Sequence, residues 1–100
     1  MSLEEALLSI WQQVLVDRAE NVVIDGSSFP VIETSRSRLR QVDFTFQGEE
    51  FRGLEQNPAT DSRWARLARE GQKVMQFLKG GRYVAVIADG KLFTYSRKGD

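Results

Sequence analysis

The chain has 100 residues, of which 41% are apolar and 28% are charged, a composition typical of one globular domain rather than of a disordered chain. It contains no cysteine and no histidine, so disulfides, thiolate metal sites, cysteine nucleophiles and histidine bases are excluded. The formal net charge is zero, but residues 1–35 carry one basic and six acidic side chains, against thirteen and eight in residues 36–100. Such asymmetry can mark a face that binds polyanions.

The sequence contains no pattern that predicts a signal peptide or a membrane-spanning segment. The first residues are acidic and amphipathic, unlike a signal peptide, and no apolar run approaches the roughly 18 residues of a membrane span. We therefore expect a cytoplasmic protein without a membrane partner.

The N-terminal segment, residues 3–17, is predicted to form a helix. Ser2 and Glu5 match the capping-box pattern that satisfies free N–H groups at a helix start. Apolar side chains recur at spacings of three and four and produce one stripe, made of Leu3, Leu7, Ile10, Trp11, Val14 and Leu15. We expect this stripe to be buried, with Trp11 as its largest side chain.

Two short strands are predicted next, over residues 22–25 and about 30–35, with a turn at Asp25-Gly26. Residues 36–40 alternate in a way that fits either an exposed strand or a loop. A clearer hairpin follows over residues 41–47 and 50–56. Gly48-Glu49 fits a type II′ turn, which would pair Phe46 with Phe51 and Phe44 with Gly53.

A second helix is predicted over about residues 61–70, after a loop rich in capping residues, with Gly71 at the position that ends it. Its apolar side contains Trp64, Leu67 and Ala68, and its opposite side contains Arg63, Arg66 and Arg69. The helix N-terminus near Asp61 and Ser62 could attract an anion, but helix capping by Thr60, Asp61 or Ser62 explains the composition of the loop without a ligand.

The last third predicts a three-stranded antiparallel meander over residues 73–79, 82–88 and 91–97, joined by Gly80-Gly81 and Asp89-Gly90. These turns would place one apolar set on a single face, namely Met75, Phe77, Val84, Val86, Phe93 and Tyr95. The opposite face is mixed, and an unknown protein partner or self-association could cover its apolar members Val74, Leu78, Tyr83, Ile87 and Leu92. The alternative for residues 73–79 is an extension of the second helix.

The predicted fold is therefore a single α+β domain over residues 1–100, in the order α-β-β-β-β-α-β-β-β. The hairpin at 41–56 and the meander at 73–97 are expected to pack with the two helices.

Basic side chains form the first candidate site. The planar guanidinium group of arginine can donate two hydrogen bonds to one phosphate. A nucleic-acid-binding surface could therefore include Arg36, Arg38, Arg40, Arg63, Arg66, Arg69 and Lys73. The simpler explanation is that a surface helix needs a polar outer face.

Carboxylates form the second candidate, made of Asp43, Glu49, Glu50 and Glu55, which could act in acid–base chemistry or hold a metal. They surround an ordinary hairpin, so structural or solvated roles are the better interpretation. No nucleophile motif of the G-x-S-x-G or S-x-x-K type occurs, and no glycine-rich phosphate loop precedes a helix. The sequence predicts no cofactor, no metal and no catalytic residue.

These features favour a non-enzymatic binding or interaction module, regulatory or accessory in role. The alternative is a nucleic-acid-binding domain that uses the arginines of 36–40 and of the second helix. A more remote alternative is an enzyme that depends on carboxylates and arginine.

Overall fold

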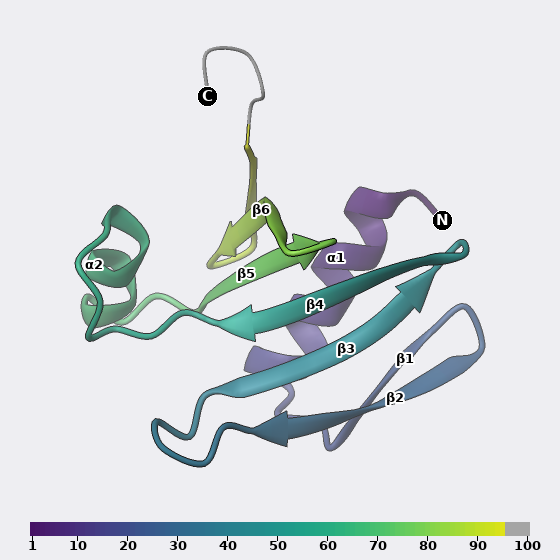
Figure 1. Cartoon of the computed structure of the whole chain (residues 1–100), viewed down its shortest axis with the longest axis horizontal. Helices are drawn as coiled ribbons and strands as arrows, with labels where there is room; N and C mark the ends of the chain where they lie inside the picture. The colour runs from purple at the N-terminus through teal and green to yellow at the C-terminus, as the bar shows by residue number, and fades with distance from the viewer. Residues whose placement is uncertain (96–100) are drawn as a thin grey trace.

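A computed structural model describes residues 1–95 and shows two helical segments and one seven-stranded antiparallel sheet (Figure 1). The elements are α1 (Leu3–Trp11), which continues as a π-helical segment η1 (Gln12–Val16), then β1 (Asn21–Ile24), β2 (Ser27–Glu33), β3 (Arg40–Phe46), β4 (Glu49–Glu55), α2 (Arg63–Arg69), β5 (Val74–Lys79), β6 (Arg82–Ala88) and β7 (Lys91–Thr94). Each strand pairs with the next one along the chain. The predicted α+β class and order of elements are confirmed, and residues 73–79 form a strand rather than a helix. Residues 96 and 97 of the predicted meander lie outside the described residues.

The first helix covers one face of the sheet, which we call the inner face. Figure 1 shows α1 behind the strands. Its capping box is present, because the Ser2 hydroxyl accepts from the Glu5 N–H and the Glu5 carboxylate accepts from the Ser2 N–H. Trp11 is buried, as predicted, and its indole N–H donates to the Lys73 carbonyl at 2.9 Å. The helix is thereby fixed to the start of β5.

The boundaries of the early strands differ from those predicted. The second strand begins at Ser27, directly after the Asp25-Gly26 turn, rather than near residue 30. Residues 34–39 form a loop that Thr34 closes, because its N–H donates to the Leu39 carbonyl and its hydroxyl accepts from the Leu39 N–H. The ambiguous segment 36–40 is therefore a loop up to its last residue, where β3 begins.

The β3–β4 hairpin has a register two residues away from the predicted one. Its turn is Gln47-Gly48, where both residues have positive φ (51° and 82°), as a type I′ turn requires. Phe44 therefore pairs with Phe51, and the predicted Phe46–Phe51 and Phe44–Gly53 pairs are wrong. A two-residue shift leaves each side chain on its original face, so the aromatic face still forms.

The β5–β6 hairpin is regular near its turn and irregular farther along. Lys79 pairs with Arg82 and Leu78 with Tyr83, in the predicted register, but the register then shifts at a β-bulge. Beyond the bulge Phe77 pairs with Ala85. The predicted pairs of Phe77 with Val84 and of Met75 with Val86 are therefore wrong, because one extra residue moves the following side chains to the other face.

This shift divides both side-chain sets predicted for the meander. Met75, Phe77, Ala85 and Ile87 join the inner core, whereas Val86 lies on the outer face with Phe93. The mixed face predicted from Val74, Leu78, Tyr83, Ile87 and Leu92 does not exist as one surface, because Ile87 and Leu92 pack against the inner core. The β6–β7 register is confirmed by the pairing of Val86 with Phe93, and the Tyr95 N–H continues it to the Val84 carbonyl.

The outer face of the sheet is covered at one end by α2, which Figure 1 shows beside the ends of β4 and β5. The apolar side of α2 packs on a small second cluster formed by Val74, Val86, Ala88 and Phe93. Gly71 ends the helix with φ of 99°, and the Gly71 and Gln72 N–H groups donate to the Ala68 and Leu67 carbonyls. Within residues 1–95, no helix is long and apolar enough to span a membrane.

Candidate binding surface

The predicted arginine stripe of α2 lies beside an open hollow of about 330 Å³, lined by Asp61, Ser62, Arg63, Arg66 and Arg69. Two of its three guanidinium groups have contacts within the fold. Arg63 lies over the Trp64 ring, 4.4 Å from its centroid. Arg69 donates to the Pro58 and Thr60 carbonyls at 2.6 and 3.1 Å and so fastens the preceding loop. The stripe is therefore partly structural.

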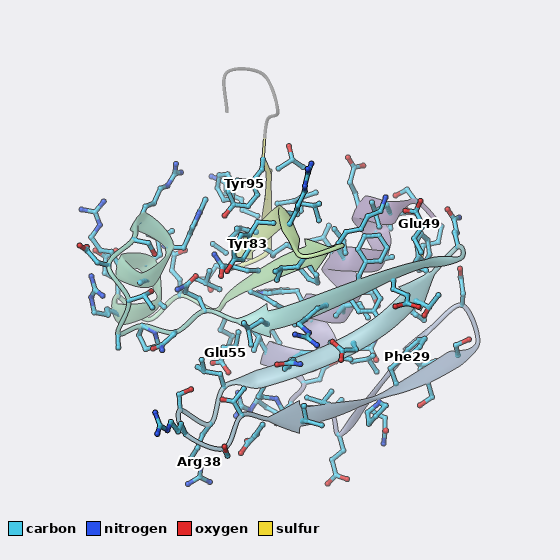
Figure 2. The ribbon with its side chains drawn as sticks, in the orientation of Figure 1. Phe29, Arg38, Glu49, Glu55, Tyr83 and Tyr95 are labelled. Carbon is cyan, nitrogen blue, oxygen red and sulfur yellow. The ribbon has the colours of Figure 1, made fainter. Side chains whose placement is uncertain are left out.

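The basic residues of the 34–39 loop do not join the α2 stripe. Figure 2 shows Arg38 at the lower corner of the sheet, apart from α2, and Arg36 is exposed in the same loop. Arg40 points into the fold, where its guanidinium donates to the Val14 carbonyl at 3.0 Å and to the Ala19 carbonyl. It thus ties the end of η1 to β3. The Lys73 side chain is exposed, while its main chain bonds to Trp11 and Asp89.

The carboxylates singled out from the sequence are dispersed. Asp43 accepts from Arg52 at 2.7 and 3.4 Å, and this hydrogen bond raises the pKa of the Arg52 guanidinium above its ordinary value. Glu49 pairs with Lys79 at 2.8 Å across the sheet. The Glu55 carboxylate accepts from the Arg40 N–H at 3.0 Å. Within residues 1–95, no group of three or more acidic side chains is placed to hold a metal ion.

The loop before α2 is organised by its own side chains. Ser62 is the N-cap, since its hydroxyl accepts from the Ala65 N–H at 3.1 Å, as capping predicted. The buried Gln56 amide donates to the Asn57 carbonyl and the Thr60 hydroxyl, and its Oε1 has no partner within the described residues. These contacts explain the composition of the loop without a ligand.

A feature that the sequence did not reveal crosses the uncovered part of the outer face. Successive strand pairs place four side chains in one line, and a ring contact with Tyr83 adds Tyr95 at its end. We call this line the cross-strand row: Asp43, Arg52, Leu78, Tyr83 and Tyr95. The two tyrosine rings lie 6.1 Å apart, with 49% and 41% of the residues exposed (Figure 2). The row borders a hollow of about 440 Å³ whose lining includes Asp43, Arg52, Leu78 and the Gly80-Gly81 turn.

Two features of the fold make the cross-strand row hard to predict from the sequence. The β4–β5 pairing, which puts Arg52 beside Leu78, joins strands separated by α2 and leaves no local sequence pattern. Tyr95 was predicted to share a buried face with Phe77, because the bulge in β5–β6 was not foreseen. The Leu78–Tyr83 pair beside the glycine turn was the one visible indication.

Comparison of the chain with protein-family models, with curated proteins and with solved structures finds no match.

Proposed function

We propose that the protein is a non-enzymatic interaction module, and that the cross-strand row binds a segment of a partner protein. The observation that carries this proposal is the exposed Tyr83–Tyr95 pair, aligned with Leu78 on a sheet face that α2 leaves uncovered. Large side chains on a monomer's surface are ordinary when they are scattered. Here they are contiguous, and Leu78 also lines the neighbouring hollow, which is typical of an interaction site.

The chemistry of the row suits recognition of protein. Tyrosine supplies a large contact area with few rotatable bonds, and its hydroxyl can bond to a partner's main chain. The Asp43–Arg52 pair at the far end of the row is exposed and would form a polar rim. An apolar and aromatic centre with a charged edge is the usual anatomy of such a surface.

Three features make protein a better ligand than nucleic acid. Charges of both signs adjoin the row, because Asp43 and Glu50 line the same hollow as Arg52. Arg40 and Arg69, two members of the proposed phosphate-binding set, already donate to main-chain carbonyls. A net charge of zero also supplies little long-range attraction for a polyanion. Catalysis is disfavoured because three of the four carboxylates considered are engaged in contacts within the fold.

The test compares two double variants of the full chain. Tyr83→Ser/Tyr95→Ser removes the centre of the row, and Val23→Ser/Ile32→Ser removes two equally exposed apolar side chains from the other end of the sheet. Immobilised proteins are used to capture partners from extract of the native host, with and without nuclease treatment, and mass spectrometry identifies them. Binding of each captured partner is then measured with purified components.

We expect the control variant to bind as the wild type does and the tyrosine variant to bind at least about tenfold more weakly, as for central interface aromatics. Equal binding by both variants would refute the proposal. If binding depends on intact nucleic acid and is lost in Arg63→Gln/Arg66→Gln instead, the nucleic-acid alternative replaces it.

A further inference from the structure

The linear strand order gives the sheet two edges, β1 and β7. The β1 edge is closed by a side chain. The Gln13 amide accepts from the Val23 N–H at 2.9 Å and donates to the Val23 carbonyl at 3.0 Å. One glutamine thus makes the two hydrogen bonds that a neighbouring strand would make there. Covering an edge in this way prevents unwanted strand pairing.

The β7 edge has no such cover within residues 1–95. In an antiparallel pair, residues alternate between bonding to one neighbouring strand and facing the other way. The Tyr95 N–H donates to the Val84 carbonyl, so by this alternation Phe93 also bonds to β6. The N–H and C=O groups of Leu92 and Thr94 therefore point away from the sheet. No other described residue hydrogen-bonds to them.

We propose that β7 pairs in antiparallel fashion with β7 of a second copy of this chain, around a two-fold axis at Phe93. Leu92 of each copy then lies opposite Thr94 of the other. Each of these two pairs exchanges both main-chain hydrogen bonds, giving about four bonds across the axis. The two Phe93 side chains face each other in a non-hydrogen-bonded pair, in which side chains approach most closely. The result is one continuous sheet through both copies.

The charges of β7 favour a second copy as the occupant. Lys91 is the one charged residue in the strand, and this register places it opposite Tyr95 of the second copy rather than opposite another lysine. An ammonium group beside a tyrosine ring is attractive, whereas like charges directly opposite each other are destabilising. Two copies with zero net charge also meet without overall repulsion. A two-fold axis makes the contact self-limiting, because each β7 edge closes the other.

This inference goes beyond the proposed function, since it rests on the main-chain groups of Leu92 and Thr94 and shares only Tyr95 with the cross-strand row. Its first test is sedimentation of the full chain over a range of concentrations. Thr94→Pro removes the outward N–H without removing a bond to β6, and proline is tolerated at such edge positions. Thr94→Ser keeps the N–H and is the matched control. We expect concentration-dependent dimers of the wild type and of Thr94→Ser, and monomers of Thr94→Pro.

Amide exchange measured by NMR tests the register without any substitution. Exchange at the Leu92 and Thr94 amides should slow as the protein concentration rises. The Phe93 amide, which bonds to β6, should be protected at every concentration and serves as the internal control. A wild type that stays monomeric overturns the inference. So does a dimer that persists in Thr94→Pro and whose wild-type form leaves the Leu92 and Thr94 amides unprotected. A monomer that still binds partner proteins through Tyr83 and Tyr95 would leave the proposed function standing.

Discussion

The two faces of the sheet differ in how much of each face the helices bury. On the inner face, Met75, Phe77 and Ile87 are fully buried beneath α1 and η1. On the outer face, α2 buries a smaller cluster at one end, and the rest is exposed around Tyr83 and Tyr95. The comparison indicates that the inner face supplies most of the folding energy. Side chains on the uncovered outer face should therefore contribute little to the stability of the fold.

The strand sequences reflect this difference directly. In β3, Val42, Phe44 and Phe46 are buried. The residues between them, Asp43 and Thr45, are exposed, as expected for a sheet with one face exposed to solvent. In β6, residues 85–88 are all buried, because α1 covers one side and α2 the other. The length of a continuous buried run thus marks where the second helix docks.

The largest effect is expected from emptying the inner face. Phe77→Ala should lower the free energy of unfolding by about 3–5 kcal/mol, because it removes a fully buried ring. That is a large share of the roughly 5–15 kcal/mol that a typical domain has. Tyr83→Ala on the outer face should change it by less than about 0.5 kcal/mol. Urea unfolding of the two variants compares the faces, and equal losses would remove the distinction between them.

An intermediate effect is expected beneath α2. Val86→Ala should lower the free energy of unfolding by about 2 kcal/mol, since it removes two buried methyl groups and leaves a small cavity. Protection from amide exchange should fall first in α2, because the packing of this helix depends on the second cluster. If α1 loses protection together with α2, the two faces unfold as one unit and the second cluster is not separate.

The smallest effect concerns the start of α1. The hydrogen bond from the Ser2 N–H lowers the pKa of the Glu5 carboxyl below its ordinary value. A lowered pKa stabilises the folded state fully above the ordinary glutamate pKa, and this stabilisation disappears as the pH falls through the lower, folded-state value. The stability difference between the wild type and Glu5→Gln should therefore shrink on acidification across that window. A difference that is constant with pH would mean that the Glu5 charge has no role.

The order of elements could be predicted because the sequence contains local patterns for it. The capping box and apolar stripe predict the first helix, and Asp89-Gly90 predicts the β6–β7 register. The two turns possible around Gly48 lie one residue apart and give registers that differ by two residues. Alternation of side chains cannot distinguish these registers, since both keep the same faces. The bulge beside Leu78 was not predicted, because neither strand contains a local pattern that marks where the register shifts.

The candidate site was harder to predict than the fold for the same physical reason. Arg40 resembles its neighbours Arg36 and Arg38 in the sequence, yet only tertiary structure brings it to the Val14 carbonyl. The cross-strand row likewise depends on pairing between strands on either side of α2. A local pattern predicts which elements form, whereas long-range registers decide which side chains share a surface.

The most direct measurement is an NMR map of the wild-type backbone amides upon titration with a purified partner that binds to it. Shift changes should concentrate around Arg52, Leu78, Tyr83 and Tyr95, on the uncovered part of the outer face, and should leave the amides of α1 unchanged. Shift changes confined to Arg63 and Arg66 on α2, with the tyrosine region unaffected, would contradict the assignment of the cross-strand row as the binding surface.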